Sequence, residues 1–397
     1  MALSEILKKA ESLEGPIAGF LAEIVSIRSP SCGEKRAVER VCAEMRAVGF
    51  DDVRVDRLGS AIGRIGSGKK KIAIDAHIDT VGEGDRSLWN FDPFKGFVKD
   101  GRVWGRGSAD QKGGAAAMVY AGKLIRDLAL EGDYTLHCTA TVMEEDCDGL
   151  CWKHLIEEEN LRPDVCVITE PTGLNIYRGQ RGRMEIEARV AGLSAHGSAP
   201  GRGVNAIYRM APLIREIEGL NEKLRDDAFL GRGTVVMSDI RSTAPSLCSV
   251  ADSCTVYLDR RLTAGETRES AVAEIEAIIK KADGSVRVPR YETAAYTGLI
   301  YPMDKYFPSW VVPEDHPAVA AAKAAHRSLF GSNARVGRWT FSTNGVSICG
   351  MHGIPCVGFG PGFEEQAHAP NEWTPVEHLW KAAAFYAAFV SAFGSRI

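Results

Sequence analysis

The fold is decided by the segment Lys71–Thr80, KIAIDAHIDT, in which an alternating apolar run leads into a histidine and an aspartate. The alternation predicts a β-strand over residues 71–76. His77 and Asp79 are two residues apart at its end, so their side chains point to the same side. Both can bind a metal, or one can bind while the other fixes the imidazole ring. A buried histidine beside a carboxylate is the simpler alternative.

The segments around this strand indicate an α/β protein. Strands are expected at Tyr134–Val142 and Val165–Thr169, and helices at Met1–Glu11, Lys112–Leu130 and Pro375–Phe393. The alternation of strands and helices is typical of a twisted, mostly parallel sheet with helices on both faces.

The pattern changes between residues 184 and 296. This stretch contains its own set of predicted elements, with strands at Met184–Val190, Thr234–Ile240 and Ser253–Arg261 and helices at Val204–Leu220 and Glu269–Lys281. Such a set forms a compact inserted α+β domain on an antiparallel sheet. We therefore predict a catalytic domain of residues 1–183 and 297–397, and an inserted lid and dimerisation domain of residues 184–296.

Composition excludes several classes of protein. With 397 residues and 45% hydrophobic residues, the chain has enough apolar side chains for a sizeable core. A net charge of −4 argues against a nucleic-acid partner. No apolar run approaches the ~20 residues that cross a bilayer, so no membrane partner is expected. The cysteines lie mostly in apolar stretches, which is typical of reduced thiols in a cytoplasmic protein.

Two short patterns have alternative interpretations. Cys147 and Cys151 are four residues apart, but no second Cys/His pair lies nearby at zinc-finger spacing. Gly63–Lys69 fits part of a phosphate-binding loop, but Lys70 stands where that loop needs serine or threonine. We expect a hairpin turn at this second position.

Further acidic and histidine side chains follow other predicted strands or lie in the loops that they feed: Asp110, Glu144, Glu145, Glu170 and His368. In an open α/β sheet, ligands gather outside the carboxyl ends of the strands, so we expect these side chains to lie together. Histidines with several carboxylates suit zinc, manganese or cobalt. A set of this size can hold two metals that share a bridging carboxylate.

The adjacent pair Glu144-Glu145 is the sharpest local signal. Neighbouring side chains diverge, so the two carboxylates cannot easily perform the same task. A site in which one carboxylate binds a metal and the other accepts a proton would explain why both are present. A solvated acidic turn that includes Asp146 and Asp148 is the alternative.

The chain resembles the dinuclear-zinc metallopeptidases and deacylases of the acetylornithine deacetylase, succinyl-diaminopimelate desuccinylase and carboxypeptidase G type. The resemblance covers essentially the whole chain, and its motifs occur in order at His77–Asp79, Gly105–Gly114, Glu144–Glu145, Thr169–Pro171 and Ala367–Glu372. The segment Phe341–Gly345, FSTNG, together with Glu145–Gly149 and Arg178–Arg183, is most similar to a subgroup labelled selenium-metabolism-linked hydrolases, a label that names no substrate.

The resemblance implies a ligand set for two zinc ions, with cobalt or manganese as possible substitutes. Asp110 would bridge the two metals. His77 and Glu170 would complete one metal, and Glu145 and His368 the other. A cis peptide typically follows the bridging aspartate, here between Asp110 and Gln111.

The resemblance also implies roles around the metals. Glu144 would be the general base, and Asp79 would orient the ring of His77. His196, in Ser194–Pro200, matches a lid histidine that stabilises the oxyanion in the partner's site of dimeric members. A homodimer through the inserted domain is therefore expected. Arg261 matches an arginine near the substrate carboxylate, with a strand-surface salt bridge as the alternative.

Further substrate contacts are less well defined. Arg181 and Arg183, beside the domain junction, would serve either an acidic substrate group or a hinge salt bridge. Two segments depart from the family pattern where substrate is expected, namely Ser242–Pro245 and Phe341–Gly345, the latter with Asn344 at its centre. These departures put the usual acetylornithine, succinyl-diaminopimelate and simple dipeptide specificities in doubt.

The sequence therefore predicts a metal-dependent hydrolase that cleaves the amide bond of an N-acylated amino acid or related small amide. Metal-bound water would attack, with Glu144 as general base. A dipeptidase or carboxypeptidase acting on small peptides is the alternative enzyme. A metal-stabilised binding or assembly protein is the non-enzymatic alternative.

Overall fold

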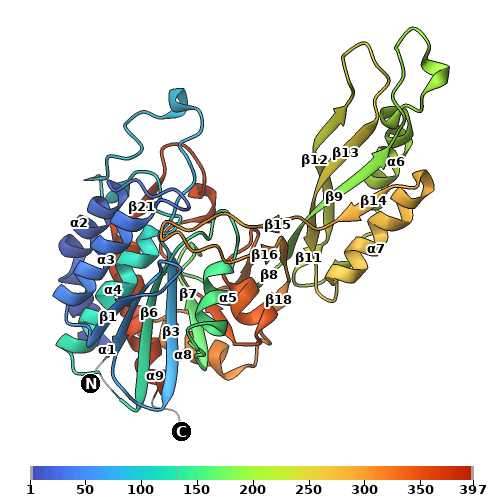
Figure 1. The fold of residues 1–397 in the computed structure, drawn as a ribbon. Helices are drawn as coiled ribbons and strands as arrows, with labels where there is room; N and C mark the ends of the chain where they lie inside the picture. Colours follow the sequence, from blue (N-terminus) through green and yellow to red (C-terminus); the bar gives the residue numbers. More distant parts are fainter. Residues whose placement is uncertain (1–2, 131, 395–397) are drawn as a thin grey trace.

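The computed structural model describes residues 3–130 and 132–394. Met1 and Ala2, the first residues of the predicted N-terminal helix, lie outside the described residues. The described chain forms a large α/β unit and a separate antiparallel unit, the lid, that projects from it (Figure 1). The predicted fold class is confirmed.

The α/β unit is built on a mixed sheet. Its strands, in spatial order, are β1 (Asp52–Val55), β2 (Ala61–Ile65), β6 (Tyr134–Thr141), β3 (Lys70–His77), β7 (Val165–Ile168), β20 (Cys356–Gly358), β8 (Ile176–Gln180) and β18 (Trp310–Val311), with β19 (Val336–Trp339) also paired to β8. The central run β6-β3-β7-β20 is parallel. Antiparallel pairs flank it at β2-β6 and β20-β8.

Helices cover both faces of this sheet (Figure 1). One face is covered by α1 (Leu3–Glu11), α2 (Glu14–Val25), α3 (Lys35–Ala47), α4 (Lys112–Asp127), α8 (Pro317–Phe330) and α9 (Val376–Gly394). On the other face, α5 (Leu150–Glu157) packs beside the turn Val346–Met351. Because both faces are covered, the central strands are almost continuously buried.

The predicted hairpin at Gly63–Lys69 is wrong. This segment does connect β2 to β3, but β6 lies between the two strands in the sheet. β6 pairs antiparallel with β2 and parallel with β3, so the two strands joined by the turn are not neighbours. The turn residues alone do not reveal that a later strand inserts between the two.

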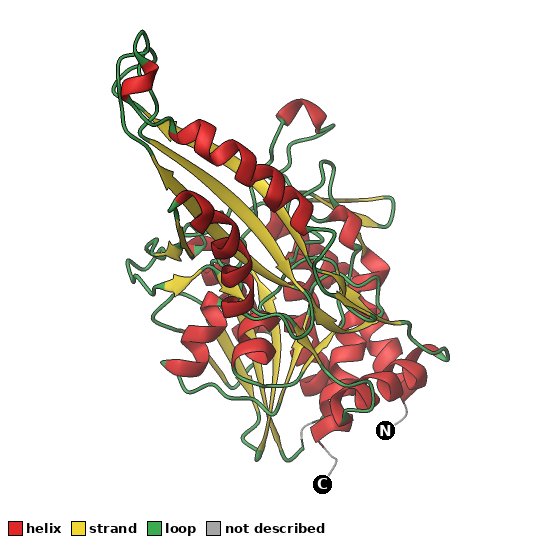
Figure 2. Ribbon diagram, turned by 90° about the vertical axis from the view of Figure 1, so that its right-hand side faces the viewer, coloured by secondary structure: helices red, strands yellow, loops and turns green. Residues whose placement is uncertain are grey.

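The lid has its own sheet and its own core. The strands are β12 (Thr234–Thr243), β13 (Ser253–Leu262), β9 (Gly182–Ala191) and β14 (Ser285–Arg287), with β17 (Tyr306–Phe307) also paired to β9. Helices α6 (Ala206–Leu220) and α7 (Arg268–Ile279) pack on one face of the long strands (Figure 2). The buried apolar side chains between them form a cluster separate from the main core.

Strand pairing in the lid crosses the predicted boundaries at residues 184 and 296. β9 already begins at Gly182, and β17 joins the same sheet after the predicted end of the domain. Three small ladders complete the fold: β10 (Asp226–Asp227) with β11 (Gly231–Arg232), β15 (Arg290–Tyr291) with β16 (Met303–Asp304), and β4 (Phe97–Lys99) with β5 (Arg102–Trp104) and β21 (Trp373–Pro375). None of the helices within residues 3–130 and 132–394 combines the length and hydropathy that crossing a bilayer requires.

His137 on β6 makes the stability of the fold depend on pH. Burial, together with repulsion from Lys71, Arg64 and Arg54, lowers its pKa to about 4. The unfolded chain has an ordinary histidine pKa near ~6.5, so it takes up a proton first as the pH falls. Stability contributed by the neutral ring is therefore complete above about pH 6.5 and is lost progressively down to about pH 4.

When the pH falls from 7 to 5, the unfolding free energy of the wild type should drop by about 2 kcal/mol more than that of His137→Gln. Urea unfolding of both proteins at the two pH values measures the difference. An equal loss in both proteins would assign the pH dependence to other groups.

Candidate metal centre and catalytic cavity

Three side chains of the site come from the ends of neighbouring strands. His77 is the last residue of β3, Glu144 follows β6, and Glu170 follows β7. These strands are adjacent and parallel, so their carboxyl ends meet at one edge of the sheet. Asp110 lies just before α4, and His368 lies in the loop before β21. The fold thus brings together residues from five separate segments.

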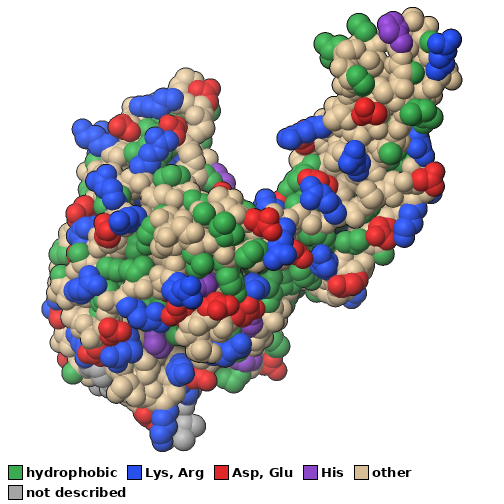
Figure 3. Space-filling model, in the orientation of Figure 1, with side chains coloured by type: hydrophobic (Ala, Val, Ile, Leu, Met, Phe, Trp, Pro, Cys, Tyr) green, Lys and Arg blue, Asp and Glu red, His purple; other side chains and the backbone are tan. Residues whose placement is uncertain are grey.

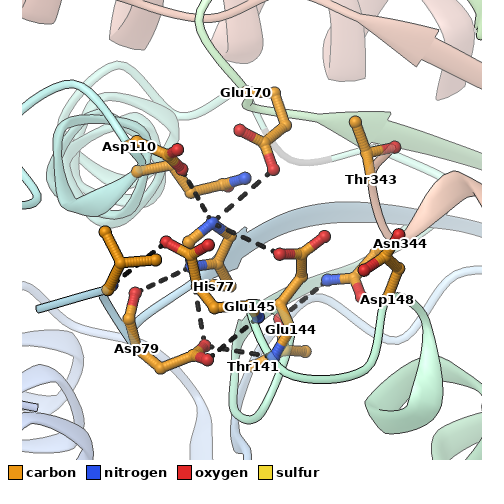
Figure 4. A network of polar contacts seen from close by, with 12 residues as sticks. His77, Asp79, Asp110, Thr141, Glu144, Glu145, Asp148, Glu170, Thr343 and Asn344 are labelled. Atoms are coloured by element: carbon orange, nitrogen blue, oxygen red, sulfur yellow. Dashed lines mark hydrogen bonds and ion pairs between the residues drawn. The ribbon is translucent and has the colours of Figure 1, made fainter. Parts of the chain in front are cut away.

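His77 is the centre of the first group of ligands (Figure 4). Its Nε2 lies 3.0 Å from Oδ1 of Asp110, 3.6 Å from Oε1 of Glu170 and 3.9 Å from Oε2 of Glu144. Its Nδ1–H donates to the backbone carbonyl of Asp79 at 2.9 Å. This bond fixes the tautomer that leaves Nε2 free to bind a metal.

Asp110 also faces a second group. His368 Nε2 lies 2.9 Å from Oε2 of Glu145 and 3.5 Å from Oδ2 of Asp110. The two oxygens of Asp110 are therefore directed at different histidines, which is the arrangement that a bridging carboxylate needs. The peptide bond between Asp110 and Gln111 is cis.

The donor set fits divalent cations. Ligand atoms of His77, Asp110 and Glu145, and of His77, Glu144 and Glu170, lie close enough together to surround an ion. Burial raises the pKa of the Glu144 and Glu170 carboxyls, and neighbouring carboxylates add to the shift. Oε1 of Glu144 and Oε2 of Glu170 are buried and have no hydrogen-bond partner among the described residues. A divalent cation would balance these buried carboxylates and occupy their unpaired oxygens.

Asp79 differs in detail from the prediction. Its carboxylate lies 3.5 Å from Nδ1 of His77, while its backbone carbonyl accepts the closer bond. The carboxylate oxygens accept instead from the backbone N–H groups of Glu144 and Glu145, at 3.2 and 3.1 Å, and from the hydroxyl of Ser31 at 2.7 Å. Asp79 therefore orients the acidic pair as well as the histidine.

Glu372 anchors the loop that contains Asp110, a role that was not predicted from the sequence. Its buried carboxylate accepts from the Arg106 guanidinium at 2.8 Å and from the backbone N–H groups of Gly107, Ala109 and Asp110 at 2.9, 2.7 and 3.1 Å. Its position within Ala367–Glu372 was the available signal. Glu372 ties the His368 loop to the Asp110 loop.

We expect Glu372→Gln to destabilise the metal-free protein by about 3–5 kcal/mol, because it leaves the buried guanidinium of Arg106 without its counter-charge. Chemical unfolding in the presence of a chelator measures this loss. Glu218→Gln, at a carboxylate that is 67% exposed on α6, is the matched control and should change stability by less than about 0.5 kcal/mol. Similar midpoints for the two variants would contradict the anchoring role.

Asn344 lies in the interior and does not face the cavity. Its amide N–H₂ donates to Asp75 at 2.8 Å and to the Thr141 hydroxyl at 3.1 Å, and its oxygen accepts from the backbone N–H of Gly149 at 3.0 Å. Asn344 is 1% exposed, and Asp75 is fully buried. Asp75, a charged residue inside an apolar strand, was the sequence signal for this network. The network joins β3 to the loop that carries Glu144.

A cavity of about 320 Å³ opens beside the carboxylates. Its lining includes the candidate metal ligands Asp110, Glu145, Glu170 and His368 together with Glu144, and also Arg183 and Arg261 of the lid sheet, Phe341 and Ser342. Figure 3 shows the open space between the lid and the α/β unit. The cavity therefore presents both cationic and anionic walls to a small polar ligand.

The two arginines of the cavity wall have acidic partners. Arg183 donates to Oδ1 of Asp148 at 2.8 Å, across the junction between the lid and the Glu144 loop. Arg261 forms a bidentate pair with Asp259 on its own strand, at 2.7 and 2.9 Å. Arg181 lies at the base of the lid and donates to the backbone carbonyl of Arg232 at 2.8 Å.

The remaining predicted positions are not gathered at the metal centre. His196 is exposed in the loop between β9 and α6, where Nδ1 lies 2.7 Å from the Ser198 hydroxyl. Ser242–Pro245 is exposed at the end of the edge strand β12. Cys147 and Cys151 belong to neither group of possible metal ligands within the described residues.

Comparison with known proteins identifies the relatives of this arrangement. Residues 73–392 match the model of peptidase family M20/M25/M40. The uncharacterized protein YgeY of Escherichia coli K12 is 54% identical over 385 residues, which cover 96% of each chain. An acetylornithine deacetylase of Vibrio parahaemolyticus is 28% identical over 363 residues, which cover 87% of this chain and 88% of that protein.

The fold is also similar to solved structures. The structure of Bacillus subtilis YXEP, described as a dinuclear metal binding peptidase, superposes with a TM-score of 0.72 at 14% identity and covers 98% of this chain and 99% of its own.

Proposed function

Because the chain belongs to peptidase family M20/M25/M40 and is a metallohydrolase of that family, we propose that it cleaves the amide bond of an N-acylated amino acid or a related small amide. The observation that carries this proposal is the cavity that Glu144 and the candidate metal-binding carboxylates line together with Arg183 and Arg261. Guanidinium groups recognise the carboxylate of an amino-acid product, and the acidic lining residues provide the groups for hydrolysis.

The predicted ligand set is retained as part of this proposal. His77, Asp110 and Glu170 would hold one metal, and Asp110, Glu145 and His368 the other. Zinc is the expected metal, because histidine and carboxylate ligands suit it, and cobalt or manganese would substitute. Two bound metal ions supply an activated water and polarise the scissile carbonyl.

Glu144 is the proposed proton carrier. It contacts His77 only at 3.9 Å, and its Oε1 is buried without a hydrogen-bond partner among the described residues. Its carboxylate would accept a proton from the attacking water and return it to the nitrogen of the leaving amine. Asp79 supports this role by holding the backbone N–H of Glu144 at 3.2 Å.

The experiment that tests the proposed function is metal analysis combined with a substrate panel. The purified protein is loaded with zinc or cobalt and offered N-acetyl, N-succinyl and N-carbamoyl amino acids beside dipeptides. Hydrolysis of the N-acyl class supports a deacylase. Hydrolysis of dipeptides alone would replace this proposal by the peptidase alternative. Arg183 and Arg261 could also bind the terminal carboxylate of a dipeptide. Metal binding without hydrolysis of any member would overturn both.

A homodimer through the lid belongs to the same proposal. β12 is an edge strand of the lid sheet and exposes Val236 and Ile240, while Tyr208 on α6 is 78% exposed. An edge strand with exposed apolar side chains can pair with a second copy of the chain. In such a dimer, His196 of one subunit would donate to the oxyanion in the site of the other. The expected location is cytoplasmic.

Mixed dimers test the action of His196 in trans. We expect His196→Ala and Glu144→Gln to be inactive alone, and their co-expressed mixture to regain about a quarter of wild-type activity. Half of the dimers are then mixed, and each has one site with both groups intact. The measurement is turnover of the purified mixture at equal subunit ratios. No recovery, with mixed dimers demonstrated by differently tagged subunits, would assign His196 to its own subunit.

A further inference from the structure

A second cavity of about 540 Å³ adjoins the metal-binding cavity, and Glu364 lines both. Tyr177 on β8 and Arg338 on β19 belong to the α/β unit, whereas Phe229 comes from the turn between β10 and β11 of the lid. The second cavity is therefore formed by both units. Glu364 is the lining residue that the two cavities have in common.

Arg338 is an unpaired cation in this wall. Within residues 3–130 and 132–394, its guanidinium makes no hydrogen bond or ion pair. It is half-buried and lies against Gly231 of the lid, with Nη2 3.2 Å from the position that a Cβ at that glycine would occupy. Asp227, in the turn region of the lid, is near enough for the charge of Arg338 to help lower its pKa, but it makes no hydrogen bond or ion pair with the guanidinium. A guanidinium with unused donors is suited to an external anion.

Other positive charges surround Arg338. Burial and repulsion from Arg338 and Arg261 lower the pKa of Arg181. Arg335 lines the same cavity. An anion placed here would relieve the repulsion between these side chains.

Two carboxylates, those of Glu364 and Glu365, line the second cavity, and neither forms an ion pair with Arg338. Oε2 of Glu364 accepts from the Thr340 hydroxyl at 2.8 Å, and burial raises the pKa of this carboxyl. The aromatic part of the wall is fixed as well. The Arg178 guanidinium stacks over the Phe229 ring at 3.8 Å. The cavity thus combines a guanidinium that has unused donors with aromatic side chains.

We propose that the second cavity is a distal subsite that binds a carboxylate of the substrate, with Arg338 as its cation. The inference rests on the proposed amide hydrolysis and specifies its substrate class. The preferred substrate is a small amide whose acyl group or amine portion ends in a carboxylate remote from the scissile bond. That carboxylate lies against Arg338 while the scissile bond lies beside Glu144.

A pair of substrates of equal length tests this inference. N-glutaryl and N-pentanoyl derivatives of one amino acid differ in the carboxylate at the end of the acyl chain. We expect wild-type kcat/KM to be at least about tenfold higher for the glutaryl compound, and Arg338→Gln to remove that preference. Arg215→Gln, at an 81% exposed arginine on α6, is the matched control and should keep the preference. An equal preference in wild type and Arg338→Gln would overturn the proposal.

A binding measurement separates this inference from the proposed hydrolysis. Glutarate should raise the unfolding midpoint of wild type and Arg215→Gln, but not of Arg338→Gln. If no amide is hydrolysed while glutarate binding still requires Arg338, the proposed function fails and the anion subsite stands. If amides are hydrolysed and glutarate stabilises all three proteins equally, the subsite fails and the proposed function stands. Arg338→Lys, which keeps the charge but not the planar fork, should bind glutarate at intermediate strength.

Discussion

Glu144→Gln should lower kcat for amide hydrolysis by about 10³-fold while the protein keeps its full metal content. The substitution preserves the shape of the side chain and removes only its ability to accept and return a proton. Glu144 lies 3.9 Å from Nε2 of His77, whereas Asp110 lies 3.0 Å from the same atom. The loss should therefore fall on turnover and not on metal binding. Metal analysis and steady-state kinetics on the same preparation measure both.

The adjacent residue provides the sharpest comparison for this prediction. Glu145 contacts His368 at 2.9 Å, so Glu145→Gln should reduce metal content together with activity. Glu218→Gln on the lid surface controls for the loss of a carboxylate elsewhere and should retain both. If Glu144→Gln also lost metal, Glu144 would be a ligand and the division of roles within the acidic pair would be wrong.

Asp110→Asn should abolish hydrolysis and reduce the bound metal below the two ions expected for the wild type. Asp110 is the carboxylate directed at both His77 and His368, at 3.0 and 3.5 Å, so its charge serves both positions. The readout is the unfolding midpoint with and without zinc. At 100 times its dissociation constant, a metal stabilises the native state by about 2.7 kcal/mol. Wild type should show a gain of this order.

The variant should show little or no gain from zinc. Its midpoint in chelator tests whether the fold survives the substitution, since Asp110→Asn also weakens the contact with His77. A zinc-dependent gain as large as in the wild type would show that Asp110 does not bind the metals.

The sequence was most informative where a functional residue follows a strand directly. His77, Glu144 and Glu170 each stand at or just beyond the end of a central strand, and these strands are neighbours. A buried strand is recognisable from its apolar residues, and parallel strands end at one edge. The grouping of these three side chains was therefore predictable from local patterns and one rule of sheet topology.

Loop residues were less predictable, because loops have no periodicity that fixes side-chain direction. Ser342 lines the cavity, yet Asn344, two residues later, is buried against Asp75. Asp75 and Asn344 are 269 residues apart, so no local pattern links them. Likewise, the contact of Asp79 with the backbone of Glu144 depends on how two loops pack, which spacing along the chain does not determine.

The anchoring of the Asp110 loop by Glu372 has a consequence for the order in which the protein is made. Asp110 leaves the ribosome 262 residues before Glu372, the residue that accepts its backbone N–H. β20, which lies between β7 and β8 in the sheet, also comes from the last part of the chain. A nascent chain therefore has the first of the proposed metal ligands long before it has the parts that hold them in place. Metal loading is expected to follow release of the nearly complete chain, and C-terminal truncation before residue 372 would leave the Asp110 loop without its anchor.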